Sequence, residues 1–122
     1  MTSEINSLVL AYLGDTIYED YVREYLIKKG IANVNDLQTE SIKYSSAKAQ
    51  CEIVKRLISE SFFTDTELEI IKRARNHKSV SHPRNCDIVT YKYATGFEAL
   101  IGYLKLENNI DRIEEIMKSI LN

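Results

Sequence analysis

Two carboxylates stand at positions where the surrounding pattern would otherwise give an apolar helix face. Asp15 and Glu98 each belong to a series that steps by three and four residues. Side chains with that spacing share one face of an α-helix. The two series are Leu8, Ala11, Asp15, Tyr18 and Val22, and Tyr91, Ala94, Glu98, Ile101 and Lys105. Because an unpaired buried carboxylate is costly, each acid is expected to be paired, to bind a metal ion or to lie at a cleft.

Glycines near both acids predict that the two helices cross closely. Gly14 precedes Asp15, and Gly96 and Gly102 flank Glu98. A glycine inside a helix costs about 0.5–1 kcal/mol relative to alanine, so its use here indicates that a backbone or a ligand approaches. Two helices that cross at these glycines would bring the two acids together.

A pair of carboxylates with little nitrogen or sulfur around it suits a hard cation such as Mg²⁺ or Mn²⁺. The alternative is that Asp15 and Glu98 each meet a lysine or arginine in a structural salt bridge. The spacing is compatible with both interpretations, because periodicity does not establish contact.

Positive charge is concentrated in the stretch 72–84. It holds five lysines or arginines, both histidines and no acid, whereas the whole chain has 16 basic and 18 acidic residues. Such a patch can hold phosphates while the rest of the surface stays acidic. The stretch contains no aromatic residue, so contact with a duplex backbone fits better than base stacking. The alternative is a solvated loop that follows a helix C-terminus, where basic residues are favoured.

The elements that must position these residues are predicted to be helices. Pro83 is the only proline and there are four glycines, fewer than strand-and-turn architectures need. Expected caps are Ser3, Asn35 in a loose capping box with Gln38, Thr64 in a capping box with Glu67, Asp87 and Asn109. The expected helices cover about 3–29, 35–45, 47–61, 65–75, 87–106 and 109 onward, with a loop over 76–86.

Length and composition indicate one globular domain over residues 1–122. Hydrophobic residues make up 44% of the chain and charged residues 28%, which excludes the composition of a disordered chain. Two cysteines are too few for a disulfide scaffold and suit a reducing cytoplasm. No apolar run approaches the roughly 20 residues of a membrane span, and residues 1–7 lack the basic start of a signal peptide.

Four strings in order give the chain a family resemblance. They are LAYLGD (10–15), YSSAKAQ (44–50), RARNHK (73–78) and YATGFEALIGYLKL (93–106). Together they resemble the ribonuclease III family, whose two signature helices carry metal-binding acids in FLGD and FEALIG. The match is closer to the Mini-ribonuclease III branch, which lacks the double-stranded-RNA-binding domain.

The resemblance implies an all-α, ribonuclease III-like endonuclease domain of about six or seven helices. It implies a homodimeric endoribonuclease that hydrolyses phosphodiester bonds of double-stranded RNA with Mg²⁺, for which Mn²⁺ can substitute, and leaves 5′-phosphates. For the Mini branch it implies maturation of the 23S ribosomal RNA precursor in the cytoplasm, with a ribosomal protein on the pre-ribosome as a further partner.

The resemblance also assigns site residues. Asp15 and Glu98 fall on the family's catalytic, metal-binding acids. The residues expected to grip the RNA backbone are Arg73, Arg75, Asn76 and Lys78. Glu19, one turn after Asp15, is a candidate water-mediated ligand, and its alternative is a surface acid.

The chain departs from the larger ribonuclease III pattern at two positions. Ala11 stands where a glutamate is usual, and Thr95 stands where an aspartate is usual. The four-acid metal centre is thereby reduced to Asp15 and Glu98, which puts a tightly bound second metal in doubt. The rival hypothesis is a helical RNA-binding or ribosome-assembly module that has lost its chemistry. Retention of both acids argues against it.

Overall fold

The structure is all-α, as the sequence predicts. This computed structural model describes residues 2–78 and 82–122, and no strand lies within them. The elements are the short 3-10 helix η1 (Thr2–Glu4) and the α-helices α1 (Ser7–Lys28), α2 (Val34–Ser45), α3 (Ala47–Ser59), α4 (Asp65–Arg75), α5 (Ile88–Leu106) and α6 (Ile110–Ile120). None of the helices in this part of the chain combines the length and apolar character needed to cross a membrane.

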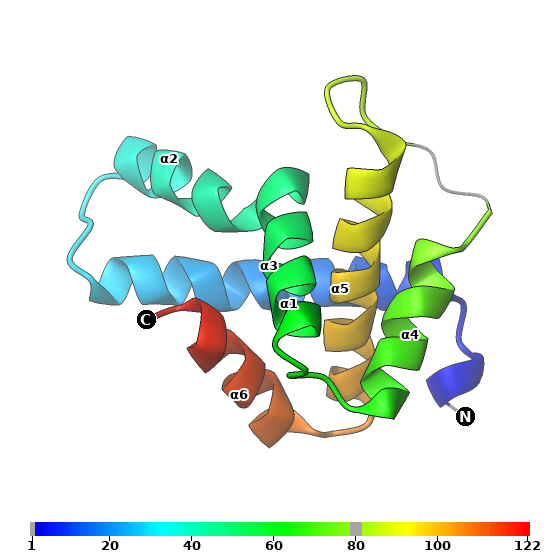
Figure 1. Cartoon of the computed structure of the whole chain (residues 1–122). Coiled ribbons are helices and arrows are strands. Elements are labelled where there is room, and N and C mark those ends of the chain that lie inside the picture. The colour runs from blue at the N-terminus through cyan, green and yellow to red at the C-terminus, as the bar shows by residue number, and fades with distance from the viewer. Residues whose placement is uncertain (1, 79–81) are drawn as a thin grey trace.

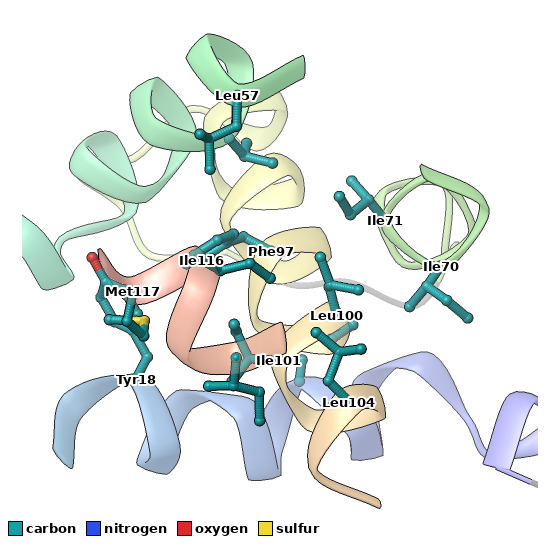
Figure 2. Close-up of a cluster of buried hydrophobic side chains, with 14 of the residues drawn as sticks. Tyr18, Leu57, Ile70, Ile71, Phe97, Leu100, Ile101, Leu104, Ile116 and Met117 are labelled. Carbon is teal, nitrogen blue, oxygen red and sulfur yellow. The ribbon is translucent and has the colours of Figure 1, made fainter. Parts of the chain in front are cut away.

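Helix α5 is the centre of the domain. Figure 1 shows α3 and α4 on either side of it and α1 running across behind it. The core forms around α5, with side chains from the other helices pointing at it (Figure 2). On the α1 side, Tyr18 meets Phe97 edge-on with ring centroids 5.4 Å apart. The Tyr18 hydroxyl donates to the carbonyl oxygen of Tyr44 at 2.8 Å, which ties α2 to the same place.

The close crossing predicted from the glycines is present between α1 and α5. A Cβ on Gly14 would overlap the carbonyl oxygen of Glu98, and a Cβ on Gly102 would overlap that of Leu10. Gly96 serves a different contact, because its Cβ would lie 2.8 Å from the carbonyl oxygen of Ile71 in α4. Helix α5 is therefore approached at backbone distance by α1 and by α4.

Most predicted caps are confirmed. Thr64 and Glu67 form a reciprocal capping box at the start of α4, and the side chains of Asp87 and Asn109 cap α5 and α6.

The predicted starts of the first two helices and the end of the third were wrong. Helix α1 begins at Ser7 rather than Ser3, because the Asn6 side chain accepts from the amide of Leu8 at 2.8 Å and so caps the helix there. Helix α2 begins at Val34, and its cap is Asn33 rather than Asn35, because the Asn33 side chain accepts from the amides of Asn35 and Asp36. Helix α3 ends at Ser59, because the chain turns into a left-handed conformation at Ser61, with φ of 55°.

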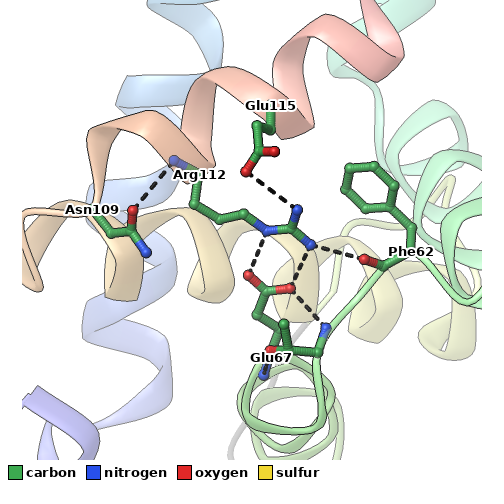
Figure 3. A network of polar contacts seen from close by, with 6 residues as sticks. Phe62, Glu67, Asn109, Arg112 and Glu115 are labelled. Carbon is green, nitrogen blue, oxygen red and sulfur yellow. Dashed lines mark hydrogen bonds and ion pairs between the residues drawn. The ribbon is translucent and has the colours of Figure 1, made fainter.

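A buried ion pair holds the start of α4 against α6 (Figure 3). Arg112 donates from Nε and Nη2 to the two carboxylate oxygens of Glu67, each at 2.8 Å. Its Nη2 also donates to the carbonyl oxygen of Phe62 at 2.8 Å. Burial alone would raise the pKa of Glu67, but the hydrogen bonds from Arg112 and from the Thr64 backbone outweigh it and hold that pKa below its usual range. The pair anchors α4 at the end opposite to its basic residues.

The crossing gives a test of the fold. Gly14→Ala should lower the free energy of unfolding by about 3 kcal/mol or more, because the new methyl group meets backbone that cannot move aside. Thr16→Ala, a change at an exposed position of the same helix, should cost less than about 0.5 kcal/mol. Urea denaturation measures both, and equal midpoints for the two variants would contradict the described crossing.

Candidate active site

The crossing of α1 and α5 places Asp15 and Glu98 beside each other. Gly14, which precedes Asp15, packs directly on the backbone of Glu98. Glu98 is half-buried and Asp15 is exposed, so Asp15 is the more solvent-accessible of the two carboxylates. The Asp15 side chain is close enough to Glu98 to raise the pKa of that carboxyl.

Neither acid has a basic partner. Among the residues that the structure describes, no lysine, arginine or histidine lies within ion-pair distance of Asp15 or Glu98. The polar partner of Glu98 is instead a neutral amide, since Gln50 Nε2 donates to Glu98 Oε2 at 3.3 Å. Gln50 is 1% exposed and projects from α3, so Glu98 lies between α1 and α3. The alternative of a structural salt bridge at Asp15 and Glu98 is therefore not found in the described part of the chain.

The environment of Glu98 opposes its ionisation. Burial raises its pKa to about 8, and the repulsion and hydrogen bond of Asp15 act in the same direction. The hydrogen bond from Gln50 favours the charged form but is too weak to reverse this. At neutral pH the metal-free pair therefore retains a proton. A cation bound between the two carboxylates would remove the cost of ionising both.

The donor set fits a hard, hydrated cation. Two carboxylates offer oxygen ligands, and the neighbouring amide of Gln50 can orient Glu98 without adding charge. In the described part of the chain no cluster of three or more His, Cys, Asp and Glu side chains is arranged for a metal. Most ligands would therefore be waters, and Mg²⁺ characteristically keeps several of them.

The two positions that depart from the larger ribonuclease III pattern are buried and carry no carboxylate. Ala11 and Thr95 are 7% and 5% exposed. Ala11 has no polar atom in its side chain, and Thr95 Oγ1 donates to the carbonyl oxygen of Tyr91 one turn earlier at 3.0 Å. Both side chains serve packing within the domain.

Glu19 has features of a surface acid and of a residue near the candidate metal site. Its carboxylate accepts from Arg23, one turn later, at 3.0 Å, as a surface acid would. Its charge also contributes to the raised pKa of Glu98, although it is the weakest of the causes. Glu19 is therefore near the acid pair while already paired on the helix surface.

The predicted RNA-binding residues lie together at the C-terminal end of α4. Arg73 Nε donates to Ser7 Oγ in α1 at 3.3 Å, and Arg75 Nη1 donates to the Tyr93 hydroxyl in α5 at 3.2 Å. Asn76 caps the helix, and both Asn76 and Lys78 are exposed. The basic end of α4 thus reaches toward the two helices that carry the acids. Part of the predicted loop, residues 79–81, lies outside the described residues.

Sequence reasoning gave no role to Gln50, although the pattern contained a signal. Gln50 precedes Val54 and Leu57 at spacings of four and three, so it is a polar residue in an otherwise apolar stripe. This is the same anomaly that identified Asp15 and Glu98. It was a weaker one, because an amide costs less to bury than a carboxylate.

Comparison with known proteins gives consistent matches over nearly the whole chain. Residues 8–109 match the model of the Ribonuclease III domain. The chain is 43% identical to Mini-ribonuclease 3 of Streptococcus pneumoniae, with 93% of this chain and 88% of that protein covered. It is 46% identical to Mini-ribonuclease 3 of Brevibacillus brevis, with 93% and 83% covered. A crystal structure of a protein from Fusobacterium nucleatum superimposes with a TM-score of 0.87 at 32% identity, covering 97% of this chain and 94% of that one.

The raised pKa of Glu98 predicts a specific pH dependence in metal-free protein. The pKa of a glutamate in the unfolded chain is about 4.3, so between about pH 4 and pH 8 the folded state binds one proton more than the unfolded state. The stability contributed by protonated Glu98 is therefore complete below about pH 4 and is lost as the pH rises to about 8.

Wild-type protein in EDTA should accordingly lose free energy of unfolding relative to Glu98→Gln across that window, by at most about 1.4 kcal/mol per pH unit. Above about pH 8 the two curves should run parallel. Chemical denaturation at a series of pH values measures the free energy of unfolding of both proteins. Subtracting one from the other cancels the effect of the other titrating groups. A difference that does not change with pH would show that Glu98 is ionised throughout.

Proposed function

This chain belongs to the ribonuclease III domain family, and from that membership we propose that it is an endoribonuclease that cleaves double-stranded RNA. The observation that carries the proposal is the pair of carboxylates without a basic partner, one of them held at a pKa of about 8. Such a pair is unfavourable for folding, and its arrangement suits a site that binds a cation during reaction.

The proposed cofactor is Mg²⁺, with Mn²⁺ as a substitute. When bound, the metal ion would stabilise charge on a phosphate oxygen and lower the pKa of a coordinated water. Asp15 and Glu98 would hold it, and Glu98 would give up its proton to do so. The Gln50 amide would keep the Glu98 carboxylate turned toward the site. Hydrolysis would leave a 5′-phosphate and a 3′-hydroxyl.

The basic end of α4 is proposed to hold the RNA backbone. The residues are Arg73, Arg75, Asn76 and Lys78. Contacts to phosphate position a nucleic acid without reading its sequence, so these residues would set the placement of the strand and not the chemistry. Binding through them would weaken steeply as salt rises.

A homodimer is proposed because a duplex has two strands and a two-fold pair supplies one site for each. The exposed face of α1 supports this. Val9 and Tyr12 lie one turn apart on that helix and are 56% and 83% exposed. Large apolar side chains that lie together on a surface mark a contact with another protein.

Within this function, we infer that the substrate is the 23S ribosomal RNA precursor. The support is the likeness to relatives called Mini-ribonuclease 3, from bacteria. The protein would then act in the cytoplasm on the pre-ribosome, where a ribosomal protein could present the RNA. Incubation with a precursor transcript, followed by mapping of the ends, tests this.

The rival function is an idle RNA-binding or ribosome-assembly module. The observation in its favour is the loss of two family acids at Ala11 and Thr95. It does not explain why position 98 holds a half-buried glutamate with no basic partner among the described residues. A glutamine there would stabilise an idle protein. The idle module predicts RNA binding without metal-dependent cleavage.

Cleavage of a duplex RNA by Asp15→Asn decides between the two. The variant should be at least about 100-fold slower than wild type with Mg²⁺, because loss of a metal-holding carboxylate exceeds the 10–100-fold effect of an outer-shell change. Its melting temperature without metal should be equal or slightly higher, because carboxylate repulsion is relieved. Wild-type cleavage rates in the variant would remove Asp15 from the mechanism.

The dimer has its own test. Tyr12→Asp should convert the protein to a monomer in sedimentation, because a charge replaces an apolar side chain at the centre of the proposed contact. Circular dichroism should show unchanged helix content, since Tyr12 is exposed within one chain. Thr39→Asp, at an exposed position of α2, is the control and should stay dimeric. A wild-type monomer that cleaves both strands would refute the dimer.

A further inference from the structure

The ring of Tyr93 on α5 contacts two positively charged side chains, one from each of two other helices. Lys55 Nζ of α3 lies 4.9 Å from the centroid of the ring, and Arg75 Cζ of α4 lies 5.2 Å from it. Arg75 is held further by its hydrogen bond to the Tyr93 hydroxyl at 3.2 Å. Tyr93 is half-buried, so the ring is a firm platform between α3 and α4. We call these three residues the Tyr93 clamp.

The two cations of the clamp lack acid partners. In the part of the chain that the structure describes, neither Lys55 nor Arg75 lies within ion-pair distance of a carboxylate. The nearby Asp87 has its carboxylate engaged by Thr90, at the cap of α5. The two distances to the ring put the charges no more than about 10 Å apart, within one Debye length at ordinary salt, so they repel each other. An anion bound beside them would relieve that repulsion.

The clamp is close to the acid pair along α5. Tyr93 precedes Glu98 by five residues, which is about 7.5 Å along the helix axis. Lys55 follows Gln50, the amide partner of Glu98, by five residues on α3. The same two helices therefore carry the clamp and the candidate metal site. An anion that repeats at short intervals, such as a nucleic acid backbone, could contact both.

We propose that Lys55, Tyr93 and Arg75 form a phosphate-binding site for one strand of the RNA substrate. Lys55 and Arg75 contact the phosphate, and Tyr93 is a positioning residue that acts through them. This extends the RNA-binding surface from α4 to α3 and adds two residues to it. The inference rests on the proposed function, because it takes the anion to be the RNA that the acid pair would cleave.

The experiment measures affinity for a duplex RNA at several salt concentrations, with wild-type protein in EDTA so that no cleavage occurs. Lys55→Gln should reduce the slope of log affinity against log salt by about 0.7–0.9, the value for one lost phosphate contact. Lys55→Arg should restore the slope. Lys118→Gln, at an exposed position of α6, is the matched control and should leave it unchanged.

Variants of Tyr93 test the platform. Tyr93→Leu removes the ring that both cations contact and should reduce the slope by more than Lys55→Gln does. Tyr93→Phe keeps the ring but loses the hydroxyl that binds Arg75, so its slope should lie between those of wild type and Tyr93→Leu. If Tyr93→Leu does not fold, the comparison of Lys55→Gln with Lys55→Arg decides, because the Lys55 side chain is exposed.

The outcomes distinguish a failure of the Tyr93 clamp from a failure of the proposed function. If wild-type protein binds and, with Mg²⁺, cleaves duplex RNA while Lys55→Gln has the same salt slope as Lys118→Gln, the clamp is overturned and the proposed function stands. If wild-type protein neither binds nor cleaves duplex RNA, the proposed function fails and the clamp fails with it.

Discussion

The approach of α1 and α5 at backbone distance is the constraint on which the rest of the structure depends. Gly14 and Gly102 permit it, since a Cβ at either position would overlap a carbonyl oxygen of the other helix. Glycine inside a helix weakens it, so the crossing is maintained at a cost that the surrounding core must offset. The edge contact between Tyr18 and Phe97 lies at this crossing and contributes to that compensation. The result is a rigid junction at which two acids from distant parts of the sequence meet.

Glu67 is buried and Glu98 is half-buried, and their surroundings shift the two pKa values in opposite directions. Glu67 accepts two hydrogen bonds from Arg112, and its pKa lies below the usual range. Glu98 accepts a hydrogen bond from the amide of Gln50 and faces Asp15, and its pKa is raised to about 8. The fold therefore pairs a buried acid with an arginine where α4 meets α6. At Glu98, burial and the Asp15 carboxylate instead outweigh the hydrogen bond from Gln50 and disfavour its charge, which is the arrangement expected of a site completed by a cation from outside.

The sequence predicted the helices, most of their caps and the meeting of the two acid-bearing helices, because periodicity, capping chemistry and glycine placement are local signals. It misplaced the start of α1, because serine and asparagine are both residue types that cap helices, and it is the side chain of Asn6 that accepts from the Leu8 amide. The contacts of Gln50 and Tyr93 could not be derived, because each depends on which face of α3 or α4 turns toward α5. The role of Gly96 was missed for the same reason, as its neighbour Ile71 belongs to α4.

Helix α5 carries both halves of the proposed chemistry on different faces. Five residues turn a helix by about 140°, so Glu98 faces α1 and α3 while Tyr93 faces α3 and α4. Because both lie on one helix that α1, α3, α4 and α6 pack against, the distance between them is set by a rigid backbone and not by a loop. A strand held by phosphate contacts at Tyr93 would therefore meet the acid pair in a constant register. On the proposed function that rigidity would matter more here than in a centre with four acids, because Ala11 and Thr95 provide no further carboxylates and a largely hydrated cation would not by itself position the scissile bond.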